Sequence, residues 1–252
     1  NESEGFTADP VYVGVGLMEV QCINPNLATL NELGFNFKEE PVYFTKPLDK
    51  STPKPKLVIY LKEVTTGTIA NISITLGLGQ VMSKDKAKFE IINDYGQSSY
   101  MPKETAKLVK DGTPPENLSW FLKNGVRFAK EGEVELVDLI RCYLNFSKVG
   151  EKTTEDQKRP TVLADEHFAL LVKQDRKTLD ELTAMFSDKN EEGERYRIAF
   201  LLGARTDDKG YVRQDIYGRF PMKPWQVKDI TKVSTTSTSL KKAVESDRKS
   251  VV

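Results

Sequence analysis

The chain has 252 residues, which is enough for one large domain or two small ones. Its 37 basic and 37 acidic residues give a net charge of zero, which argues against a protein that coats nucleic acid by bulk charge alone. A basic groove balanced by acidic surface elsewhere remains compatible with this composition. With 38% hydrophobic residues and no apolar run near the roughly 20 residues of a membrane helix, the composition predicts a soluble protein with a real core.

Residues 1–9 are polar and predict a flexible arm. Alternating apolar residues then predict a strand over residues 10–23, followed by a short helix over residues 27–34 with Asn24 or Asn26 as its cap. Further runs rich in β-branched and aromatic residues predict strands over residues 41–45, 56–64, 69–76, 88–93 and 97–101. We expect a loop at Gly77, Gly79 and the polar run SKDKAK. Strands of this length, joined by short turns, are typical of a small barrel or sandwich.

Helical patterns follow the first group of strands. We expect helical structure over residues 102–110, and the clearest amphipathic helix covers residues 134–144, where apolar residues recur at spacings of three and four. Two more helices are predicted over residues 162–174 and 177–186. Strand patterns return at residues 196–204 and 211–220 around an Asp-Asp-Lys-Gly turn, and residues 233–252 predict a flexible tail. The whole order predicts an α+β fold.

Catalytic signatures are missing from the sequence. It contains no GxxxxGK phosphate loop, no GxGxxG motif and no GxSxG elbow. The single histidine, His167, is expected at a surface or packing position of a helix. Cys22 and Cys142 lie far apart in apolar segments, which predicts buried, reduced thiols. Two cysteines and one histidine lack the spacing of a metal site, and the catalytic motifs are missing, so we expect no metal, no other cofactor and no enzymatic activity.

Basic and aromatic residues alternate on several predicted strands, where Tyr60 and Lys62 share one face and Tyr211 and Arg213 share another. Binding of a single strand needs this mixture, because cations contact the phosphates and bases stack on aromatic rings with about 1–3 kcal/mol each. The alternative is that the rings are half-buried sheet residues and the arginines pair with acidic residues. The candidate contact residues are Tyr60, Lys62, Phe89, Trp120, Lys123, Arg127, Arg197, Tyr211, Arg213 and Tyr217.

Several segments resemble the OB-fold single-stranded DNA-binding proteins of tailed phages, including those of crAss-like phages. The segments are GLMEVQCINPN at residues 16–26, EEPVYF at 39–44, KLVIYLKEV at 56–64, IANISITLG at 69–77, RFAKEGEVELVDLIRCYLNF at 127–146 and RQDIYGRF at 213–220. The resemblance covers most of residues 11–225. It implies an OB-like small β-barrel as a single domain over residues 10–232, with a helical insertion at about residues 103–187 and a C-terminal β-hairpin.

The function that this resemblance implies is sequence-tolerant single-stranded DNA binding in phage replication or recombination. The strand would lie across the barrel face, in the cytoplasm of the bacterial host, with replication proteins as further partners. The C-terminal sequence SLKKAVESDRKSVV departs from the strongly acidic tail with which relatives recruit partners. The alternative function is a phage structural or assembly protein without catalytic activity, which a barrel or sandwich core with inserted helices also suits.

Overall fold

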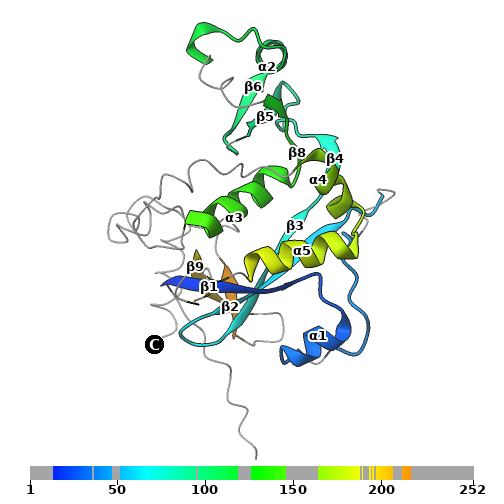
Figure 1. Ribbon diagram of the computed structural model, residues 1–252, viewed down its shortest axis with the longest axis vertical. Helices are drawn as coiled ribbons and strands as arrows, with labels where there is room; N and C mark the ends of the chain where they lie inside the picture. Colours follow the sequence, from blue (N-terminus) through cyan, green and yellow to red (C-terminus); the bar gives the residue numbers. More distant parts are fainter. Residues whose placement is uncertain are drawn as a thin grey trace, which may run out of the picture.

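The computed structural model describes residues 14–35, 37–46, 52–94, 96–118, 126–145, 164–187, 189, 193, 195, 197–206 and 212–216. Figure 1 shows a body of strands with helices beside it, and a smaller lobe at one end of the long axis. The predicted arm over residues 1–9 and the predicted tail over residues 233–252 lie outside the described residues.

Five antiparallel strands form the main sheet, in the order β10–β9–β1–β2–β3. They are β1 (Gly14–Ile23), β2 (Lys56–Glu63), β3 (Ile69–Thr75), β9 (Ile198–Thr206) and β10 (Val212–Ile216). The two outer strands, β3 and β10, contact each other, so the sheet is nearly closed. The fold is therefore α+β with a barrel-like sheet, compatible with an OB-like barrel.

Strand β1 holds this sheet together because its two halves have different partners. Its first half pairs with β9 from Gly14 to Met18, and its second half pairs with β2 from Met18 to Ile23. The register shifts between Val20 and Cys22, so one extra residue bulges there. A bulge increases the local bend and twist of a strand, which helps a short sheet to curve toward closure.

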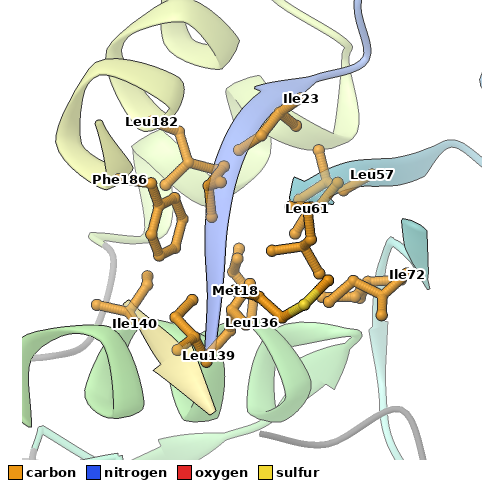
Figure 2. Close-up of a cluster of buried hydrophobic side chains, with 14 of the residues drawn as sticks. Met18, Ile23, Leu57, Leu61, Ile72, Leu136, Leu139, Ile140, Leu182 and Phe186 are labelled. Carbon is orange, nitrogen blue, oxygen red and sulfur yellow. The ribbon is translucent and has the colours of Figure 1, made fainter. Parts of the chain in front are cut away.

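The barrel core is shared between strands and helices. Alternate residues of β2, such as Leu57, Ile59 and Leu61, point inward, as the period-two pattern predicts. Helices α3 (Glu133–Asn145), α4 (Asp165–Val172) and α5 (Arg176–Phe186) add their apolar faces to the same cluster. Figure 2 shows side chains of α3 and α5 gathered around β1. These helices, which belong to the predicted insertion over residues 103–187, are therefore continuous with the barrel core.

The lobe (the described residues 82–94, 96–118 and 126–128) is a small unit built on a three-stranded sheet in the order β6–β5–β7. Its strands are β5 (Lys88–Asn93), β6 (Ser98–Pro102) and β7 (Val126–Phe128), and helix α2 (Lys103–Lys110) packs on one face. Its core consists of Ile91, Met101, Ala106 and Val109. A two-stranded ladder of β4 (Gly77–Gln80) and β8 (Lys130–Glu131) connects the lobe to the barrel.

Two sequence-based predictions differ from the structure. The expected loop at Gly77 and Gly79 is strand β4, because it pairs with β8, a partner too short to give a periodic signal. The expected strand over residues 41–45 is only an isolated bridge between Phe44 and Pro55. The bridge is framed by hydrogen bonds from the Thr45 amide to the Lys54 carbonyl and from the Lys56 amide to the Tyr43 carbonyl. The groups that would extend the ladder have other partners, since the Lys54 amide donates to the Thr45 hydroxyl and the Lys56 carbonyl accepts from the Asn24 side chain. The predicted helix is α1 (Leu27–Glu32), capped by the Asn26 side chain, which accepts a hydrogen bond from the Thr29 amide.

Candidate nucleic-acid interface

The outward face of β2 and β3 is the face with which OB-like barrels bind oligonucleotides. Because side chains alternate along a strand, every second residue of β2 lies on this face, together with its cross-strand partner on β3. The outward pairs are Lys56–Thr75, Val58–Ser73, Tyr60–Asn71 and Lys62–Ile69. The face therefore has an apolar centre with lysines at both ends.

The apolar centre of this face is covered by the chain itself. Tyr60 is only 6% exposed and packs with Cys22 of β1 and Leu30 of α1. The ring of Phe35 meets the Tyr60 ring edge-on, with 5.3 Å between centroids. Tyr60, predicted to stack on a base, therefore supports the β1–β2 connection (residues 24–55) and has little ring surface left for a ligand.

Asn24 anchors the start of the β1–β2 connection. It is buried at a φ of +44°, where its side chain accepts from the Val58 amide at 2.7 Å and donates to the Lys56 carbonyl at 2.7 Å. The Arg176 guanidinium donates to the Asn24 carbonyl at 2.8 Å. The connection is thus attached both to β2 and to the first turn of α5, which holds α1 over the outward face.

The groups beneath the connection are neutral. Burial raises the pKa of the Cys22 thiol to about 11, and Arg176 opposes this only in part. Burial also raises the pKa of Tyr43, whose hydroxyl donates to the Pro25 carbonyl at 2.6 Å. A protonated, enclosed thiol is a poor nucleophile, so the structure indicates a packing role for Cys22.

Aromatic rings reach the surface on the β1–β2 connection. The Phe35 ring lies 5.9 Å from the Phe37 ring, so Tyr60, Phe35 and Phe37 form a row that leads outward from the sheet. Phe37 is 46% exposed, and Phe44, later in the same connection, is 43% exposed. Neither Phe37 nor Phe44 is among the candidates predicted from the sequence. The sequence signal that could have identified Phe37 is the pair of phenylalanines, Phe35 and Phe37, two residues apart between two predicted strands.

Two of the predicted contact residues come together beside this face. Lys62 is exposed and lies opposite Glu19 in the register of β2 and β1. Arg197, just before β9, places its Nε 3.3 Å from the Glu19 carboxylate. Glu19 thus offsets much of the charge of Arg197. We therefore define the candidate interface by the residues that remain accessible at or beside the outward face: Phe37, Phe44, Lys56, Lys62, Asn71, Ser73 and Thr75.

Phe89 and Arg127 lie elsewhere and have packing partners. The Phe89 ring lies 4.9 Å from that of Phe128 in the lobe. The Arg127 side chain pairs with the fully buried carboxylate of Glu133, and its Nε lies 3.4 Å from the Asp165 carboxylate. Phe89 is therefore a partly buried sheet residue and Arg127 is paired with acidic residues, which is the alternative to DNA contact that the sequence left open.

The remaining predicted residues are placed only in part. Arg213 lies in β10 opposite Arg205 of β9 in the strand register. Trp120, Lys123, Tyr211 and Tyr217 lie outside the described residues.

The described part of the chain contains no group of three or more histidine, cysteine or acidic side chains placed to hold a metal ion. Among its helices, none has the length and apolar character to span a membrane. No protein-family model, curated protein or solved structure matches the chain. The candidate interface therefore rests on the residues of this chain alone.

Proposed function

We propose that this chain binds single-stranded DNA without sequence preference, as an OB-like, non-enzymatic protein of phage replication or recombination. The observation that carries the proposal is Phe37, an exposed ring at the end of an aromatic row that begins at buried Tyr60 and passes through partly buried Phe35. It lies beside the outward face of a nearly closed five-stranded sheet. An exposed ring held from behind loses little freedom when a base stacks on it, which favours binding. The phage context comes from the resemblance of the sequence segments described above.

The chemistry of the interface suits a single strand. Phe37 and Phe44 offer ring faces to unpaired bases, which are accessible only when the bases are not stacked inside a duplex. Lys56 and Lys62 lie at opposite ends of the outward face and contact phosphates, while Asn71, Ser73 and Thr75 donate or accept hydrogen bonds. Every base has a ring face, so this kind of contact tolerates any sequence.

The test is a fluorescence anisotropy titration of labelled oligo-dT at low salt. Wild-type protein binds, and Phe37→Ala weakens binding by the stacking energy of one base, about 1–3 kcal/mol or roughly 5- to 150-fold. The matched control is Leu78→Ala, which removes an apolar side chain of similar exposure, 54%, from β4. The control binds like wild type.

Two results would overturn the proposal. One is no binding of oligo-dT by the wild-type protein at low salt. The other is equal affinity of Phe37→Ala and Leu78→Ala when both proteins retain the wild-type circular dichroism spectrum, because the exposed ring would then contribute nothing to binding.

A further inference from the structure

Helix α2 carries a row of lysines on one side of the lobe. Lys103, Lys107 and Lys110 are spaced by four and three residues, which places them along one helix face. The Lys103 ammonium lies 5.9 Å from the centre of the Phe89 ring, and the Lys110 ammonium lies 5.1 Å from the centre of the Phe128 ring. The two rings hold both ends of the row in place.

These lysines resemble Lys56 and Lys62 of the candidate interface, which form no ion pair in the described part of the chain, and they differ from several other basic residues. Lys54, Arg127, Lys130, Arg176, Lys177 and Arg197 each pair with a carboxylate. Within the described residues, by contrast, none of the three lysines of α2 forms an ion pair. An aromatic ring attracts an ammonium group through its quadrupole but carries no net charge, so the row keeps its positive charge.

The helix dipole does not explain the whole row. It favours cations in the last turn, which accounts for Lys107 and Lys110. Lys103, however, is the first residue of the helix, where the dipole disfavours a cation. Exposed Lys88 lies opposite Pro102, next to this end of the helix, and adds a fourth ammonium there. Glu104 also lies in this first turn and the Asp85 carboxylate interacts with Lys88, so the uncompensated positive charge lies on the lysine face of the helix. Three ammonium groups along one helix face suit an anionic partner.

The lobe stands at one end of the candidate interface. Strand β3 ends at Thr75, the cross-strand partner of Lys56, and the chain continues through Leu76 and β4 toward the lobe. Figure 1 shows the lobe projecting beyond this end of the sheet. A single strand that leaves the outward face at Lys56 and Thr75 is therefore directed toward the lobe.

We propose that the lysine face of α2 is a second contact surface for the same DNA strand and binds its phosphate backbone. Along a helix, residues spaced by three or four lie about 5–6 Å apart, so a short stretch of backbone can reach all three ammonium groups. This inference rests on the proposed function. It adds that the full binding site is longer than the barrel face.

The experiment compares oligo-dT of about 10 nucleotides, within the length that one OB-like barrel covers, with oligo-dT of about 40 nucleotides, at one protein per oligomer. Lys107→Gln/Lys110→Gln is the test variant, and Lys173→Gln/Lys177→Gln is a control with the same change in charge at positions away from the lobe. Lys107→Arg/Lys110→Arg keeps both positive charges. The quantities measured are the ratio of the two affinities and the dependence of each on salt.

Wild type, the control and the arginine variant bind the long oligomer more tightly than the short one. The test variant does not show this difference, and its salt slope on the long oligomer falls by about 1.4, or about 0.7 for each phosphate that is no longer neutralised. Its affinity for the short oligomer stays unchanged. A test variant that still binds the long oligomer as tightly as wild type overturns the second surface and leaves the proposed function intact, whereas failure of wild type to bind either oligomer overturns both.

Discussion

Gly132 connects β8 to α3 at a point where the backbone and the surrounding atoms leave no room for a side chain. Its φ is +80°, and a Cβ atom built there would lie 2.3 Å from the Thr75 carbonyl oxygen. That oxygen belongs to the end of β3 and cannot move aside without displacing the strand. Gly132 therefore allows β8 and the start of α3 to lie close to the end of β3.

We expect Gly132→Ala to destabilise the protein by several kcal/mol. The left-handed conformation alone costs a residue with a side chain about 1–2 kcal/mol, and the clash with the carbonyl adds to it. Gly112→Ala is the matched control, since Gly112 has nearly the same φ, +81°, with no atom within 4 Å of the added Cβ. Urea denaturation followed by circular dichroism measures both free energies of unfolding. Equal losses in the two variants would show that the clash is absent.

At the scale of elements, the start of α3 depends on a buried acid. The Glu133 carboxylate is fully buried, accepts a hydrogen bond from the Lys130 amide at 2.9 Å and pairs with Arg127. Arg127 and Lys130 also reach Asp165 at the first turn of α4. This network connects strands β7 and β8 to helices α3 and α4 of the barrel core. It therefore orients the lobe relative to the barrel.

Glu133→Gln keeps the shape of the side chain and removes its charge. Arg127 would then keep a largely enclosed positive charge after losing its buried carboxylate partner, and we expect a loss of about 3 kcal/mol in the free energy of unfolding. Asp165→Asn removes the other carboxylate and should cost about 1 kcal/mol or less, because that group is well exposed. Thermal and urea unfolding of both variants give the comparison. A smaller loss for Glu133→Gln than for Asp165→Asn would contradict this assignment.

Local periodicity predicted most of these elements but could not predict what covers them. Strands β2 and β3 and helix α3 have long apolar repeats, and their predicted bounds agree closely with the structure. Strands β7 and β8 have three and two residues, too few for any period to show. Alternation correctly placed Tyr60 and Lys62 on one face, yet it contains no information on α1, which covers Tyr60 through contacts made only in the folded chain.

At the scale of the whole molecule, apolar side chains gather in two main cores. The barrel core includes residues of β1, β2, β3 and β9 together with α3, α4 and α5. The lobe core of Ile91, Met101, Ala106 and Val109 is a separate cluster. The lobe is joined to the barrel by the short ladder of β4 and β8 and by a small buried cluster in which Ile92 of β5 packs with Val137 of α3. A region with its own small core and few connections is expected to open at a lower free energy than the rest.

Two methionines allow the same substitution in each core. Met101 is buried in the lobe and Met18 in the barrel, and truncation of a buried methionine to alanine costs about 2–5 kcal/mol. Hydrogen exchange followed by mass spectrometry shows which strands and helices lose protection in each variant. We expect Met101→Ala to speed exchange in β5, β6 and α2 while β1, β2 and β3 keep wild-type protection. Met18→Ala should speed exchange in the barrel strands and in α3 and α5 together, because these elements share one core.

Opening of the lobe also bears on the second DNA-contact surface. If Met101→Ala speeds exchange equally in the lobe and in the barrel strands, the molecule opens as one unit and the two cores are energetically continuous. If the lobe opens alone, a DNA strand bound at both surfaces must hold it closed. Saturating long oligo-dT should then restore protection of α2 in Met101→Ala, and the short oligomer should not, because only the long strand reaches the lysines of the lobe.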